Sequence, residues 1–202
     1  VSSDQTRAAE LYTRAANLGE EVAMHNLAIH LFNGEGVRKS IKDGLKYMRK
    51  SAEAGFVSAQ FKLGEYYHQG KHVAQSYKNA LKWYREAAEQ GHEGACFSLG
   101  LMYKDGEGVK RSTAKAMEHF ELAAQNNADN CELLARFVED GELGPPDELL
   151  IQKWRERSRE LESAVDGEDE TNVAGYIPGR KSRKLRLNEK RSGSKKASPP
   201  IY

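Results

Sequence analysis

The side chains best suited to chemistry are six histidines and two cysteines. No histidine belongs to a His-Glu-x-x-His pair, and His68 and His72 stand on either side of Gly70 rather than on one helical face. No Ser/His/Asp set, Cys/His set or isolated carboxylate pair stands outside the overall sequence pattern. We therefore predict that the chain has no catalytic residue, no metal site and no cofactor.

One glycine-rich stretch, Gly106-Glu107-Gly108-Val109-Lys110-Arg111-Ser112-Thr113, invites comparison with a phosphate-binding loop. Its glycine spacing and its end differ from the Gly-Lys-Ser/Thr pattern that cradles phosphate. The same slot recurs as Gly34-Glu35-Gly36-Val37 and Gly70-Lys71-His72-Val73. We therefore interpret this stretch as the loop between the two helices of a repeat.

The recurrence extends along the chain with a period of 36 residues. The columns are Gly19, Gly55, Gly91; Ala23, Ala59, Ala95; Leu27, Leu63, Leu99; Gly34, Gly70, Gly106; Val37, Val73, Val109; and Ala16, Ala52, Ala88, Ala124. Self-similarity at a fixed period is typical of a solenoid.

Each period contains two helices. Ala59, Leu63 and Tyr67 share one helical face, and Leu81, Tyr84 and Ala88 share another. Glycine follows each helix, where a residue in the left-handed conformation closes the last turn. The sequence thus predicts an all-α superhelical solenoid.

The residues that fill these columns resemble the Sel1-like repeat, which is related to the tetratricopeptide repeat. The best match spans residues 80–109, which contain Ala80, Trp83-Tyr84, Ala87-Ala88 and Gly91, then Ala95, Leu99-Gly100, Tyr103 and Gly106-Glu107-Gly108-Val109. The resemblance implies helix-turn-helix repeats that serve as adaptors between proteins. It covers about two thirds of the chain and is more specific for fold than for function.

The predicted domain boundaries follow from the 36-residue period. The repeat array occupies 4–143, with repeats at about 8–43, 44–79 and 80–115 and a decayed repeat at 116–143. Residues 4–18 are predicted to form the second helix of a repeat whose first helix is missing. The first repeat is therefore expected to have been cut away. A polar capping helix is expected at 146–163, an acidic hinge at 164–174 and a basic extended tail at 175–202.

A second face of each first helix is also apolar, because Phe61 precedes Leu63 by two residues and Phe97 precedes Leu99 by the same interval. By comparison with tetratricopeptide-type arrays, this face lines the concave groove and binds a partner helix or an extended peptide. The alternative is that successive first helices bury these side chains against one another as core. The predicted groove residues are His25, Ile29, Phe32, Phe61, Glu65, His68, Phe97, Leu101, Lys104, Leu133 and Phe137.

Cys96 and Cys131 fall in or beside the alanine column, so we predict that both are buried and inert. Two cysteines cannot form a disulfide framework, and the sequence has no Asn-x-Ser/Thr acceptor. This composition favours a reducing intracellular compartment, with the cytosol, the nucleus and the mitochondrial matrix all open. No apolar run is long enough for a membrane span.

The net charge of +1 averages two opposites, because residues 175–202 carry nine basic side chains and one acid. The basic residues are Arg180, Lys181, Arg183, Lys184, Arg186, Lys190, Arg191, Lys195 and Lys196. Such density suits a nucleic acid backbone, an acidic protein surface or a nuclear import receptor, and a solvated tail is the alternative. The end of the chain, Pro199, Pro200, Ile201 and Tyr202, matches the Pro-Pro-x-Tyr ligand of WW domains.

The sequence therefore predicts a non-enzymatic scaffold with a protein partner in its groove and a tethering tail. The first alternative is a component of a ribonucleoprotein that binds RNA or DNA through the tail. The second is a regulatory repeat region from a larger enzyme.

Overall fold

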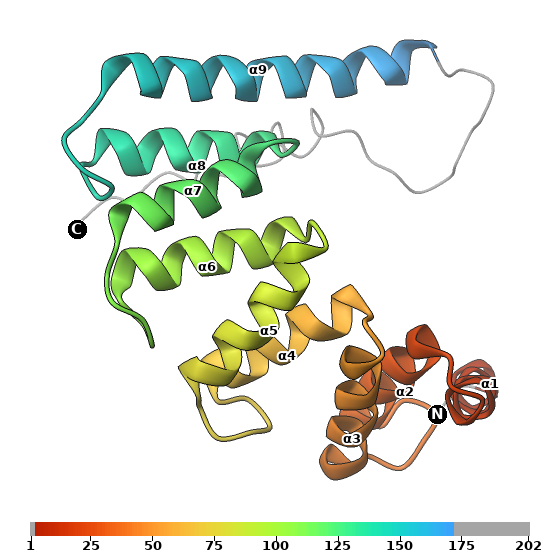
Figure 1. Cartoon of the computed structure of the whole chain (residues 1–202). Helices are drawn as coiled ribbons and strands as arrows, with labels where there is room; N and C mark the ends of the chain where they lie inside the picture. Colours follow the sequence, from red (N-terminus) through yellow and green to blue (C-terminus); the bar gives the residue numbers. More distant parts are fainter. Residues whose placement is uncertain (1–2, 172–202) are drawn as a thin grey trace, which may run out of the picture. The chain divides into compact units, whose positions relative to one another are not determined.

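A computed structural model describes the backbone of residues 3–171 and the side chains of residues 4–164. The chain divides into two units, residues 1–162 and 163–202, and the repeats lie in the first. All regular elements in the described part are helices (Figure 1): α1 (Ser3–Asn17), α2 (Glu21–Asn33), α3 (Ile41–Glu53), α4 (Val57–Gln69), α5 (Tyr77–Glu89), α6 (Glu93–Asp105), α7 (Thr113–Ala124), α8 (Ala128–Glu139) and α9 (Glu148–Thr171). The predicted all-α solenoid is confirmed.

The helix bounds reproduce the 36-residue period. The first helices α2, α4 and α6 begin at Glu21, Val57 and Glu93, and the second helices α3, α5 and α7 begin 36 residues apart as well. From α1 to α8, each helix packs against the next one along the chain. The unit is thus a row of helix pairs, each stabilised by contacts with its neighbours in sequence.

Serine caps fix the start of every second helix from α3 to α7. Ser40, Ser76 and Ser112 stand 36 residues apart, and each hydroxyl accepts a hydrogen bond from the backbone N–H three residues later at 3.2–3.3 Å. Such a cap satisfies an N–H group that the helix itself leaves unpaired. The serine column is therefore a further signal of the 36-residue repeat.

Glycine ends the first helices, as predicted. Gly34, Gly70 and Gly106 adopt φ values of 78°, 72° and 78°, in the left-handed region that other residues avoid. The backbone N–H of each donates to the carbonyl four residues earlier, which closes the last helical turn. The chain then crosses a short loop to the serine cap.

Within a repeat, the two helices touch where a glycine faces an aromatic ring. A Cβ atom on Gly64 would stand 2.4 Å from the Tyr84 ring, and one on Gly100 would stand 2.6 Å from the Phe120 ring. The α2–α3 pair has Ala28 and Met48 in the same two positions, and both are fully buried. Alanine is larger than glycine, and where it replaces the glycine, an unbranched methionine replaces the aromatic ring.

The fourth pair is one residue out of register with the other three. Helix α8 begins at Ala128, which is 35 residues after Glu93, so Leu134 and Ala135 take the places of Leu99 and Gly100. Leu134 is 1% exposed and Ala135 is fully buried. A strict 36-residue spacing would have put Arg136 at this glycine position, whereas the 35-residue spacing puts Ala135 there.

Helix α9 begins as the second helix of this fourth pair. Ser158 donates to the carbonyl of Ala128 at the start of α8, just as Ser51 in α3 donates to the carbonyl of Glu21 at the start of α2. The capping helix predicted at 146–163 therefore starts at Glu148 and belongs to the repeat pattern. It continues to Thr171, through most of the segment predicted as an acidic hinge.

Both cysteines are buried and free, as predicted. Burial raises the pKa of Cys96 and of Cys131, so the reactive thiolate is disfavoured at each. Among the described residues, no three His, Cys, Asp or Glu side chains are placed to bind a metal ion. A search of the same residues finds no helix long and apolar enough to cross a membrane.

Candidate protein-binding face

The first helices carry the predicted groove residues, which we call the first-helix face. These are His25, Ile29, Phe32, Phe61, Glu65, His68, Phe97, Leu101, Lys104, Leu133 and Phe137. Phe32 is buried, and the other ten are half-buried. The face thus has side chains that are supported by the fold and still reach solvent.

Phe32 belongs to the core rather than to an open surface. Its ring is 6% exposed, stacks on His72 at 4.7 Å between centroids and meets the edge of Tyr66 at 5.5 Å. Gly44 in α3 lies against the same ring, so close that a Cβ atom there would collide with it. Phe32 is the one predicted residue for which the alternative of a buried core position fits better.

A row of rings connects successive repeats along the face. His25 meets Phe56 at 5.2 Å, Phe61 stacks on His92 at 4.3 Å, and Phe97 lies 6.5 Å from Phe137. Each partner belongs to the following repeat, so these rings hold neighbouring first helices together. The two interpretations of the rings are therefore not exclusive, since His25, Phe61 and Phe97 pack against the next repeat and are still half-buried rather than enclosed.

Phe137 lies between helices more than on the face. Its ring packs against Phe120 of α7 at 5.1 Å as well as against Phe97, and the Lys104 ammonium lies 5.2 Å from its centroid. Ile29 and Leu101 pack at the edges of two hydrophobic clusters. The apolar members of the face are continuous with the core beneath them.

The charged members of the face pair within the array. Lys62 donates to Glu65 at 2.6 Å on the same helix, and His68 pairs with Glu107 of the next repeat at 2.6 Å. Lys104 pairs with Glu142 after α8, and this hydrogen bond raises the pKa of the Lys104 ammonium. The pairs leave the centre of the face with little net charge.

Burial keeps two histidines of this region neutral. It lowers the pKa of His25, with a further contribution from the charge on Lys62, and it lowers the pKa of His92. His92 also caps α6, because its Nδ1 accepts the backbone N–H of Ala95 at 3.2 Å. A protonated Nδ1 would lose this acceptor role.

The predicted tail sites lie outside the described residues. These are the basic residues from Arg180 to Lys196 and the Pro-Pro-x-Tyr end at Pro199, Pro200 and Tyr202. They stay predictions from sequence.

The fold and the face define a class of protein, an α-solenoid of paired helices with a half-buried row of rings along its first helices. The Sel1 repeat model matches residues 1–20, 22–56, 57–92 and 94–127, and the chain belongs to the Sel1 repeat family. Repeats of this family are generally scaffolds for interactions between proteins. The family model begins its full repeats at 22, 57 and 94, close to the starts of the first helices. The repeats predicted from the sequence begin instead at the second helices, at about 8, 44 and 80.

Solved structures show the same architecture. A Sel1 repeat protein from Oxalobacter formigenes is 27% identical, with a TM-score of 0.72 over 92% of this chain and 79% of that one. A protective antigen of uropathogenic Escherichia coli strains with an SLR fold is 30% identical, with a TM-score of 0.69. The match covers 75% of this chain and 33% of the antigen, so the chain spans about a third of its length.

A cysteine-rich protein B from Helicobacter pylori shares the fold, with 24% identity, a TM-score of 0.51 and coverage of 64% of this chain and 94% of that one. No curated protein matches the sequence.

Proposed function

We propose that the chain is a non-enzymatic scaffold that holds a helix or an extended segment of a partner protein on the first-helix face. Its basic tail would tether this complex to a larger assembly. The observation that carries the proposal is the row of rings from His25 through Phe61 to Phe97, each of which packs against another repeat element and is only half-buried.

Physical reasons favour such a row as a binding surface. Rings already fixed by the core lose little conformational entropy when a partner covers them. Aromatic side chains also contribute much of the binding energy at protein interfaces. The paired charges around the row favour a partner segment that is mainly apolar, since no strong field of one sign attracts a charged one.

The test is a selection of displayed peptides on the full chain, followed by calorimetric titration of the best peptide. The double variant Phe61→Leu with Phe97→Leu removes both rings and keeps apolar volume. We expect it to weaken binding by about tenfold or more, as for loss of a central aromatic contact.

The matched control is Tyr103→Leu, which removes a ring that is 7% exposed and stacks on His119 of α7 rather than on a ring of the face. It is expected to lower the melting temperature and to leave the affinity unchanged at temperatures where the protein is folded. Equal affinities for the wild type and the double variant would contradict a role for the first-helix face.

A further inference from the structure

A second candidate contact surface lies on two of the second helices, away from the first-helix face. Basic side chains recur there at intervals of four and three residues, which places them on one side of each helix. We call them the basic surface, and its members are Lys42, Lys46 and Arg49 in α3 and Lys78, Lys82 and Arg85 in α5. All six side chains are exposed, because they lie opposite the buried residues of their helices.

Little negative charge lies within the stretches that contain the basic surface. Residues 38–50 contain six basic side chains and one acid, and residues 71–85 contain four basic side chains and no acid. The acid is Asp43, which accepts a hydrogen bond from the Ser40 hydroxyl at 2.6 Å at the start of α3. Three further acids lie in the last turns of the two helices, namely Glu53, Glu86 and Glu89.

The positive charges of the basic surface are largely unpaired within the described residues. The one ion pair found there for these six side chains joins Lys82 to Glu86 at 3.8 Å. Both of its side chains are more than a third exposed, so solvent screens the attraction. The surface therefore keeps most of its charge available to a partner.

The repeat fold does not require basic residues at these positions. The equivalent residues are Thr6, Glu10 and Thr13 in α1 and Ala114, Glu118 and Glu121 in α7. These helices pack in the same array with neutral or acidic side chains in the same places. The basic residues are thus confined to two successive repeats, and acids stand at the middle position on either side of them.

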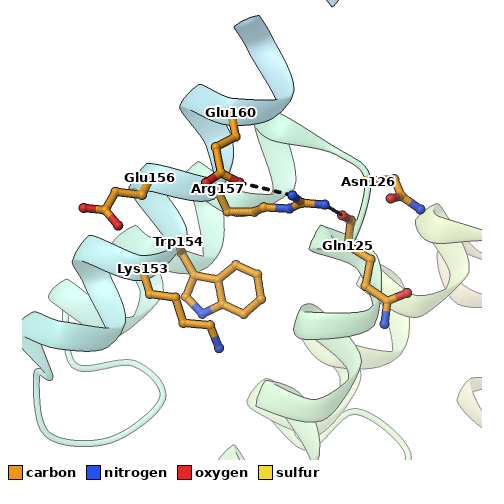
Figure 2. Close-up of a pocket in the computed structure, with 7 residues that line it drawn as sticks. All are labelled: Gln125, Asn126, Lys153, Trp154, Glu156, Arg157 and Glu160. Atoms are coloured by element: carbon orange, nitrogen blue, oxygen red, sulfur yellow. Dashed lines mark hydrogen bonds and ion pairs between the residues drawn. The ribbon is translucent and has the colours of Figure 1, made fainter. Parts of the chain in front are cut away.

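Helix α9 shows how these positions look when charges are balanced. It corresponds to α3 through Ser158, so Lys153 and Glu156 take the second and third positions of the basic surface. They border a pocket of about 480 Å³ together with Arg157 and Glu160, and Arg157 donates to Glu160 at 3.2 Å (Figure 2). Two bases and two acids alternate there, whereas α3 and α5 each present three bases in a row.

Tyr67 links the two halves of the basic surface. Its hydroxyl accepts a hydrogen bond from Arg49 of α3 at 3.3 Å, and its ring packs against the cluster that contains Ala80 of α5. Arg85 makes the same contact with Tyr103 at 3.0 Å, one repeat later. Equal contacts in successive repeats place both halves on the same side of the array. A neutral hydroxyl also orients each guanidinium without cancelling its charge.

The side chains around the basic surface do not suit an interface with a protein or a membrane. Protein interfaces have an apolar centre and are depleted in lysine, and insertion into lipid needs exposed apolar side chains. The exposed large apolar side chains in the described part of the chain lie outside α3 and α5. They are Leu11, Leu18, Val22, Leu122 and Leu149.

We propose that the basic surface binds the phosphate backbone of a nucleic acid duplex without reading its sequence. Lysine and arginine contacts to phosphates supply affinity that does not depend on base sequence. A duplex fits better than a single strand, because every aromatic residue of α3 and α5 is buried or half-buried and none is exposed for a base to stack on. The inference goes beyond the scaffold function and uses none of the residues of the first-helix face.

The test is a fluorescence titration of the full chain with a labelled DNA duplex of mixed sequence, about 20 base pairs or two helical turns long. The test variant combines Lys42→Gln, Lys46→Gln and Lys78→Gln. We expect it to weaken binding by about tenfold or more at about 0.1 M salt. The slope of log affinity against log salt is expected to decrease by up to about 2.7, since each phosphate contact contributes about 0.9.

The matched control combines Arg136→Gln, Lys153→Gln and Arg159→Gln, which are exposed positions of the fourth helix pair. It makes the same change in net charge, so it measures the effect of overall charge alone. We expect it to leave the slope unchanged. The basic tail is present in the wild type and in both variants, so its contribution cancels in the comparison, and circular dichroism verifies that all three proteins are folded.

The proposal is overturned if the wild type does not bind the duplex, or if the two triple variants lose affinity equally. It is also overturned if the test variant loses binding to phosphatidylserine vesicles or to poly-glutamate but not to the duplex, since the surface would then serve a membrane or an acidic protein. Failure of the peptide test at the first-helix face leaves this comparison unaffected, so the two proposals fail separately.

Discussion

At the scale of single residues, the contact between the two helices of a repeat depends on matched pairs of side chains. Gly64 faces Tyr84 and Gly100 faces Phe120, whereas Ala28 and Met48 occupy the same two positions in the α2–α3 pair. The methyl group of an alanine needs extra space. A rigid aromatic ring cannot move to provide that space, whereas a flexible methionine side chain can. The chain therefore contains both solutions to one packing problem.

This pairing predicts a compensating pair of substitutions. Gly100→Ala alone is expected to destabilise the protein by about 1–3 kcal/mol, because the new methyl group would stand 2.6 Å from the Phe120 ring. Phe120→Met in the same chain is expected to recover part of that loss, as the Ala28 and Met48 pair suggests. Urea unfolding of both single variants and the double variant measures the coupling, and strict additivity would count against the matched-pair account.

A second prediction at this scale concerns pH. Burial lowers the folded-state pKa of His25, His72, His92 and His119, so the unfolded chain binds more protons than the folded one as the pH falls through the ordinary histidine value. The stability from these neutral histidines is present above a pH of about 6.5 and is lost below it. We expect the melting temperature to fall between about pH 7.5 and about pH 5.5.

His92→Asn isolates one contribution to this effect. Asparagine keeps the helix cap, as Asn127 does at the start of α8, but it does not titrate. The variant should therefore show a smaller drop in melting temperature over the same pH range. An unchanged pH profile would mean that His92 does not contribute.

At the scale of elements, α9 has two parts with different roles. Its first part completes the fourth helix pair through Ile151, Trp154 and Ser158, which are all buried. Arg155 adds an ion pair with Glu139 at the end of α8, in the place where Tyr84 and Phe120 pack in earlier repeats. The helix then runs on to Thr171, beyond the unit that contains the repeats.

Truncation separates these parts. Deletion of residues 165–202 is expected to change the melting temperature little, because it leaves Trp154 and Ser158 in place. Deletion of residues 144–202 removes the cover from Phe120, Leu134 and Val138 and is expected to lower it strongly, since a solenoid needs its end repeat closed. Thermal unfolding followed by circular dichroism tests both, and equal losses would mean that the distal part of α9 is structural.

At the scale of the whole molecule, the predicted roles of the first-helix face and of the basic tail can be tested separately. Nine basic residues between 180 and 196 predict binding to polyanions that weakens steeply with salt. Deletion of residues 175–202 is expected to weaken such binding and to leave peptide affinity at the first-helix face unchanged. Fluorescence titration with single-stranded RNA at two salt concentrations measures it, and salt-insensitive binding would exclude a contact with phosphates.

The sequence by itself determined the helix pairs, because a strict period repeats the same local signals for starts, stops and apolar faces. Gly34, Gly70 and Gly106 end helices for a reason that lies in their own backbone. Membership of the Sel1 repeat family follows from the same columns. The serine caps were equally readable and were overlooked, since a polar column carries less weight than an apolar one.

Only the tertiary structure decided which rings of the first helices are buried and which are half-buried. Phe32 shares its repeat position with His68 and Lys104, which are half-buried, but Phe32 is enclosed by Tyr66 and His72, which come from the next repeat. The one-residue shift of α8 and the pairing of Ser158 with Ala128 likewise depend on how whole helices pack. Local patterns specify helices, whereas the burial of a side chain depends on neighbouring helices that the period does not specify.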